Sequence, residues 1–150
     1  MKNIKSNFIE SIGNTPLIKL KAASELTGCN IDGKAEYFNP GESVKDRAAL
    51  FIVQDAIKRK LISRGGTIVE GTAGNTGIGL AVVCKEYNLK LKIVSRNTQS
   101  IEKKETLKEL GAELIEVDAV PYSNPKNYIK QSKQIAEDLG KTSSHGVYWA

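Results

Sequence analysis

The lysine at position 45 is the residue of this sequence best placed to act as a nucleophile. It follows the turn-forming run Asn39-Pro40-Gly41 and comes two residues after Ser43, which stands where a helix N-cap is expected. The dipole and the unpaired N–H groups of a first helical turn disfavour an ammonium ion, and burial at the floor of a cleft would act in the same direction. Because a neutral amine is the form that attacks a carbonyl carbon, Lys45 is a candidate for forming a Schiff base.

A glycine-rich segment further along the chain could bind an anion. Residues 71–79 read GTAGNTGIG, and glycines at positions 71, 74, 77 and 79 let a ligand approach the backbone closely. The N–H groups that precede a helix expected from Ile78 would form a cradle for a carboxylate or a phosphate. The same pattern also suits a tight strand-to-helix turn with packing glycines, so the segment alone leaves both interpretations open.

A nucleotide cofactor is one alternative ligand for this segment. From Gly74 onward the glycines run G-x-x-G-x-G, which reverses the dinucleotide fingerprint G-x-G-x-x-G. The following strand ends in Ser95 and Arg96 and not in the acidic residue that binds a ribose. Arg96 could still bind a 2′-phosphate, which keeps NADP binding as an alternative.

Strands that alternate with single helices predict an α/β fold that brings these segments together. Such alternation gives right-handed crossovers and a three-layer parallel sheet with helices on both faces. Ligands bind at the carboxyl edge of such sheets, so we expect Lys45 and residues 71–79 to meet there. The expected strands cover residues 15–21 and 34–38, which could pair with each other, and residues 67–70, 91–95, 112–117 and 147–150; the expected helices cover residues 44–60, 78–87, 99–110 and 126–139.

Composition argues against several classes of partner. The net charge is +5 and the isoelectric point about 9.1, but the lysines are scattered and no aromatic residues interleave with them, so we expect no nucleic acid partner. No apolar run is long enough to cross a bilayer, and we expect no membrane partner. Cys29 and Cys84 lack metal-ligand spacing, which predicts reduced thiols and no metal. The amino-terminal residues lack the apolar stretch of a secretory signal, which predicts a cytoplasmic location.

Four motifs, in order and at the right separations, resemble the cysteine synthase family of pyridoxal-phosphate (PLP) enzymes. They are SIGNTPLIKL near the start, NPGESVKDRAAL around Lys45, TIVEGTAGNTGIGLA, and TQSIEKKETLKELGAELIEV. The resemblance covers essentially all 150 residues and implies PLP fold type II, the tryptophan synthase beta-like architecture. Family members convert O-acetylserine and sulfide to cysteine and acetate.

The resemblance also implies roles for individual residues. Lys45 would form the Schiff base with PLP, be displaced by the substrate, and then remove its α-proton. Asn75 matches the asparagine that hydrogen-bonds the 3′-oxygen of the cofactor. The loop that closes over the substrate carboxylate would be Thr72, Ala73, Gly74, Asn75 and Thr76. Ala73 stands where many family members have serine, which removes one hydroxyl donor and would change affinity by about tenfold or less.

The family comparison further predicts how the chain is organised. Residues 1–150 match the amino-terminal portion of the family, residues 91–136 match its mobile subdomain, and the carboxyl-terminal half is absent. Because the family's phosphate cup and pyridine-binding serine lie in that half, we expect this truncated chain alone to bind PLP weakly. Full-length members are usually homodimers.

Two other functions stay open at this point. The chain could belong to a related PLP lyase of the cystathionine β-synthase or dehydratase type, since these share the NPG-x-S-V-K-D-R and GNTG motifs. Alternatively, it could be an inactive remnant that keeps the α/β scaffold and serves as a binding module. The residues do not separate these alternatives.

Overall fold

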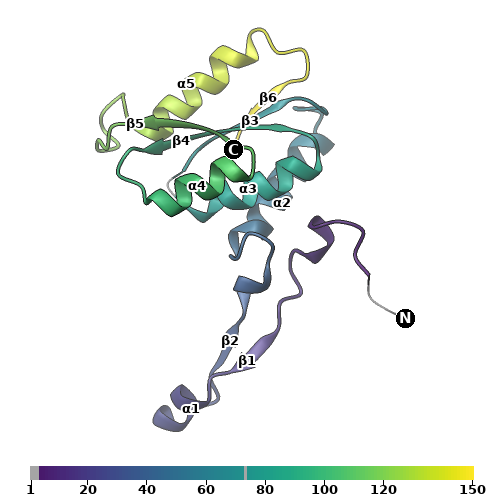
Figure 1. The fold of residues 1–150 in the computed structure, drawn as a ribbon, viewed down its shortest axis with the longest axis vertical. Coiled ribbons are helices and arrows are strands. Elements are labelled where there is room, and N and C mark those ends of the chain that lie inside the picture. Colours follow the sequence, from purple (N-terminus) through teal and green to yellow (C-terminus); the bar gives the residue numbers. More distant parts are fainter. Residues whose placement is uncertain (1–3, 73) are drawn as a thin grey trace.

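A parallel sheet forms the centre of the molecule (Figure 1). The computed structural model describes residues 4–72 and 74–150, and within them the sheet has four strands in the order β5-β4-β3-β6. The strands are β3 (Thr67–Gly71), β4 (Lys90–Arg96), β5 (Glu113–Val117) and β6 (Val147–Trp149), and all neighbours run parallel. The α/β prediction with a parallel sheet is therefore confirmed.

Helices cover both faces of this sheet. On one face lie α2 (Lys45–Lys58), α3 (Asn75–Glu86) and α4 (Ile101–Glu109), and on the other lies α5 (Tyr128–Gly140) (Figure 1). Ile68 of β3 belongs to one hydrophobic core with buried side chains of α2 and α3. Gly71 of the same strand faces α5, since a Cβ built on it would lie 2.6 Å from the Ser132 hydroxyl oxygen. The predicted three layers are present.

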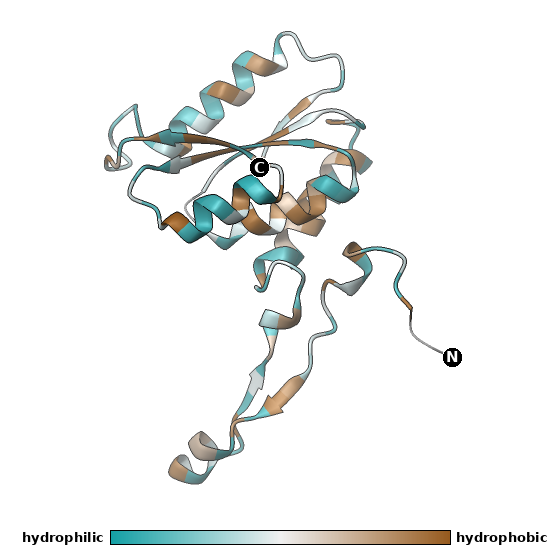
Figure 2. Ribbon diagram, viewed as in Figure 1, coloured by the Kyte–Doolittle hydropathy of each residue, from teal (hydrophilic) through white to brown (hydrophobic). Residues whose placement is uncertain are grey.

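The helices follow their apolar patterns. The buried side of α2 carries Ala49, Val53 and Ala56 at helical spacing, whereas α3 is apolar nearly all round because it lies between α2 and the sheet (Figure 2). Asn127 caps α5 by accepting a hydrogen bond from the Ile129 N–H at 3.1 Å. No helix among the described residues is long and apolar enough to span a membrane.

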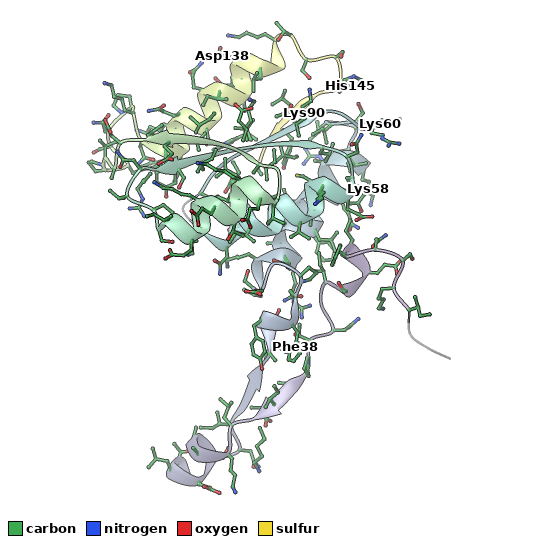
Figure 3. The ribbon with its side chains drawn as sticks, in the orientation of Figure 1. Phe38, Lys58, Lys60, Lys90, Asp138 and His145 are labelled. Carbon is green, nitrogen blue, oxygen red and sulfur yellow. The ribbon has the colours of Figure 1, made fainter. Side chains whose placement is uncertain are left out.

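The amino-terminal residues form an arm that projects away from the sheet and its helices (Figures 1 and 2). Its elements are β1 (Leu17–Lys19), α1 (Lys21–Thr27), β2 (Asp32–Lys34) and η2 (Glu36–Phe38). The preceding turn η1 (Ile9–Ser11) is not part of the arm, since Ile9 packs against the core. As predicted, the two strands pair, in antiparallel orientation. Their predicted extents are wrong, because residues 21–27 form a helix and residues 36–38 form a 3-10 turn. Leu17 of β1 is 67% exposed and Phe38, at the base of the arm, is 60% exposed (Figure 3).

Two glycine substitutions test the packing of α5 against the sheet. A Cβ at position 71 would lie 2.8 Å from the Ile129 Cα, so Gly71→Ala should lower the free energy of unfolding by about 1–3 kcal/mol. Gly140 ends α5 with open space around it, so Gly140→Ala should raise the same quantity by up to about 1 kcal/mol. Urea titration of both variants checks this, and equal effects would contradict the packing described.

Candidate functional site

Lys45 is the first residue of α2. The N–H of Lys45 donates a hydrogen bond of 3.1 Å to the Ser43 hydroxyl, although the N-cap position itself is Val44 and not Ser43 as predicted. Lys45 precedes the buried Ala49 by four residues, which places both on the same face of the helix. The chain passes from the last turn of α2 to the amino-terminal end of β3. The first turn of α2 therefore lies at the carboxyl edge of the sheet. The Lys45 side chain is exposed there, whereas we expected it, from the sequence, to be desolvated.

The glycine-rich segment reaches the same edge. It leaves β3 at Gly71, and α3 begins at Asn75, three residues earlier than predicted, with Gly74 in an extended conformation as its N-cap. The Gly74 N–H donates a hydrogen bond of 3.3 Å to the Thr72 hydroxyl. Asn75 and Thr76 therefore belong to the first turn of α3, where N–H groups are free to bind an anion. Ala73 lies outside the described residues.

The first turns of α2 and α3 belong to helices that touch directly. A Cβ built on Gly79 would lie 3.1 Å from both the backbone nitrogen and the Cα of Asp46. Only glycine allows this approach without a shift of the backbone. The residue next to Lys45 thus rests against the last residue of the glycine-rich segment.

An ion pair anchors the segment before Lys45. The Arg47 guanidinium donates to both carboxylate oxygens of Glu36 at 3.0 Å and to the Thr15 hydroxyl at 3.1 Å. The Arg47 guanidinium, together with hydrogen bonds from Asn39 and Thr15, lowers the pKa of Glu36 to about 2. This two-point geometry fixes the first turn of α2 relative to the arm.

Asn39 links this ion pair to the loops on either side of it. Its side-chain oxygen accepts from the Gly13 N–H at 2.8 Å, and its amide nitrogen donates to the Ser43 carbonyl at 3.0 Å and to a Glu36 carboxylate oxygen at 2.8 Å. Asn39 is buried. The network therefore joins the SIGNTPL motif to the motif that carries Lys45.

Glu70 is a second carboxylate with an altered pKa near the glycine-rich segment. It is the penultimate residue of β3 and shares a strand face with Ile68, toward α2 and α3. Burial raises the pKa of Glu70 to about 7, against a smaller lowering by the Gly71 N–H. A carboxyl group that titrates near neutral pH thus lies two residues before Thr72.

The sequence did not single out four of these polar residues. Glu36 and Arg47 are eleven positions apart, and no local pattern marks them as partners; Asn39 was assigned only to a turn, and Glu70 only to a strand. Arg96, the candidate for a 2′-phosphate, lies at the end of β4 with its guanidinium carbon 5.7 Å from the centre of the Tyr128 ring. No group of three or more metal-ligating side chains occurs in residues 4–72 and 74–150.

The family model described as "Pyridoxal-phosphate dependent enzyme" matches residues 9–150. The chain belongs to this family. Its cofactor class is therefore PLP and not NADP, and the residues at the carboxyl edge fit such a group: a lysine amine for an aldehyde, and helix N–H groups for an anion.

Individual relatives agree with this assignment. Cysteine synthase 1 from Neurospora crassa is 56% identical over 138 residues, which are 92% of this chain and 37% of the relative. The crystal structure of cysteine synthase from Entamoeba histolytica has a TM-score of 0.81 and 33% identity, covering 99% of this chain and 43% of that one. The crystal structure of an O-acetylserine dependent cystathionine beta-synthase from Helicobacter pylori has a TM-score of 0.81 and 33% identity, and the match covers 97% of this chain and 46% of that one. The chain thus spans less than half the length of these relatives.

The Glu36 ion pair should make stability sensitive to acid. Because the folded-state pKa of Glu36 is about 2, against an ordinary value of 4.5, its contribution is complete above pH 4.5 and is lost as the pH falls toward 2. Glu36→Gln should therefore be less stable than the original chain at pH 7, and the difference should shrink below pH 4.5. Thermal unfolding across this range checks it, with the exposed Glu86→Gln as the control.

Glu70 should act on stability in the opposite direction. Its folded-state pKa of about 7 means that the folded chain holds a proton between pH 4.5 and 7 that the unfolded chain has lost, so stability falls as the pH rises through this window. Glu70→Gln should gain about 2 kcal/mol relative to the original chain between pH 5 and pH 8. The stability of both proteins is measured by urea titration at each pH. If it changes with pH in the same way for both, the Glu70 carboxyl is not buried as described.

Proposed function

We propose that the whole protein is a PLP-dependent β-replacement enzyme that converts O-acetylserine and sulfide to cysteine and acetate. The observation that carries this proposal is the contact between two helices: Lys45 opens α2, and the neighbouring Asp46 rests on α3 at Gly79, the last residue of the glycine-rich segment. The similarity to cysteine synthases from Neurospora and Entamoeba supports the choice of substrates.

Lys45 has two tasks in this proposal. Its Nζ would hold the cofactor through the aldehyde carbon, and the same nitrogen would take the α-proton of the amino acid. PLP supplies the electron sink for the bond changes at the α- and β-carbons. The exposed position of Lys45 at the carboxyl edge leaves its amine accessible to both partners.

The glycine-rich segment binds and orients the amino acid. Thr72, Gly74 and Thr76 present hydroxyl and N–H donors at the start of α3 to the substrate carboxylate, where the helix dipole also favours negative charge. We assign the side-chain amide of Asn75 to the 3′-oxygen of the cofactor, and we include Ala73 in the carboxylate loop on the family pattern. These donors need no net charge to hold an anion.

Three further assignments belong to the proposal. Residues 91–136 would move as a subdomain that closes over the substrate, the full-length protein would be a homodimer, and its location would be cytoplasmic. A lyase of the cystathionine β-synthase type is the second candidate, and the H. pylori structure favours keeping it, since its name combines O-acetylserine with that reaction. Product analysis with sulfide or homocysteine as the nucleophile separates the two.

Trapping the cofactor on the protein tests the role of Lys45. The purified chain is mixed with PLP, reduced with borohydride, and mapped by peptide mass spectrometry, which records binding even when it is weak. We expect Lys45 to carry most of the label and Lys45→Ala to lose the visible absorption of the bound cofactor, whereas Lys58→Ala at the far end of α2 should not. Equal spectra for the chain and Lys45→Ala would show that the assignment is wrong.

A further inference from the structure

The side chain next to Lys45 is an unusual one to bury. Asp46 has no exposed surface, and within the described residues its Oδ1 has no hydrogen-bond partner. Its Oδ2 accepts a hydrogen bond from the Gly41 N–H. Burial raises the pKa of this carboxyl above its ordinary value.

Two glycines enclose the carboxyl group of Asp46. A Cβ built on Gly41 would lie 2.5 Å from Oδ1 and 2.9 Å from Oδ2, and a Cβ built on Gly79 would lie 3.1 Å from Oδ1. Gly41 belongs to the turn before Lys45, and Gly79 belongs to α3. One side chain thus contacts the turn before the lysine, the helix that carries it, and the helix that follows the glycine-rich segment.

Stability alone does not account for this arrangement. A buried carboxylate oxygen without a partner costs free energy, and an acidic residue in a first helical turn does not need to be buried to gain from the helix dipole. Residues that are held at a cost to stability concentrate where geometry serves function. The position of Asp46 beside the proposed Schiff-base lysine supplies such a function.

We propose that Asp46 is a positioning residue for Lys45: its carboxyl group joins the Gly41 turn to the first turn of α2, against α3 at Gly79, and so holds the Lys45 amine in front of residues 71–79. This inference rests on the proposed function of Lys45. It assigns Asp46 no contact with the cofactor or the substrate.

Substitutions at position 46 separate the hydrogen bond from the charge. Asp46→Asn keeps an acceptor for the Gly41 N–H, whereas Asp46→Ala removes it. With borohydride trapping of PLP as the assay, we expect the ratio of label on Lys45 to label on Lys58 to stay within about twofold for Asp46→Asn and to fall by about tenfold for Asp46→Ala. Asp55→Ala is the matched control, because Asp55 is an exposed residue of α2 paired with Arg59.

Substitution of Gly41 tests the same contact independently. Gly41→Ala forces a methyl group against the carboxyl and should lower the Lys45 label as Asp46→Ala does. The double variant should be no worse than Asp46→Ala alone, because removing the carboxyl makes room for the methyl group. Additive losses, an unchanged label ratio in Asp46→Ala, or a loss in Asp46→Asn equal to that in Asp46→Ala would each overturn the proposal.

Amide hydrogen exchange distinguishes this proposal from the proposed function. If the original chain carries no preferential label on Lys45, the proposed function fails, and the positional claim is then decided by exchange at the Gly41 and Lys45 amides. Asp46→Ala should remove protection at both, and Asp46→Asn should retain it. Protection that is unchanged in Asp46→Ala would overturn the positional claim regardless of the cofactor.

Discussion

The close approach of α2 to α3 is the constraint on which the site depends. It occurs where Gly79 has no side chain, so that the backbone of Asp46 can lie against it. A Cβ at position 79 would lie 3.1 Å from the Asp46 backbone, so any larger residue there would force α2 and α3 apart by about a few tenths of an ångström or more. Both helices begin at the carboxyl edge of the parallel sheet, as the sheet topology requires. The missing side chain of Gly79 then allows α2 and α3 to approach closely.

The α/β layers could be predicted because their signals are local. Strand β3 is a short apolar run, and α3 is apolar nearly all round, as a helix between another helix and a sheet must be. For the candidate site, the rule that ligands bind at the carboxyl edge predicts that Lys45 and the glycine-rich segment share a site there. The start of α3 was placed too late because Gly74, which serves as its cap, has no side chain to mark the boundary.

The pairing of the two arm strands could be predicted, but the extents of the arm's elements and the polar network could not. Helix α1 buries only Ser24, so its sequence has no apolar stripe, and residues 21–27 gave no helical signal. The ion pair of Glu36 with Arg47 and the enclosed carboxyl of Asp46 depend on contacts between separate segments, which periodicity does not encode. Tertiary contacts also turned residues 36–38 away from the strand that their composition favours.

The way the arm is attached has a consequence for how the unfolding of this chain would be measured. In residues 15–38, all of them described, Ala35 is the single buried apolar side chain, so the arm exposes little new apolar surface when it detaches. The slope of a denaturant titration scales with newly exposed surface and therefore reports the sheet with its covering helices. The arm is instead held by hydrogen bonds and an ion pair, which makes it a separate local unfolding unit. A single midpoint would describe one part of the molecule and leave the other unobserved.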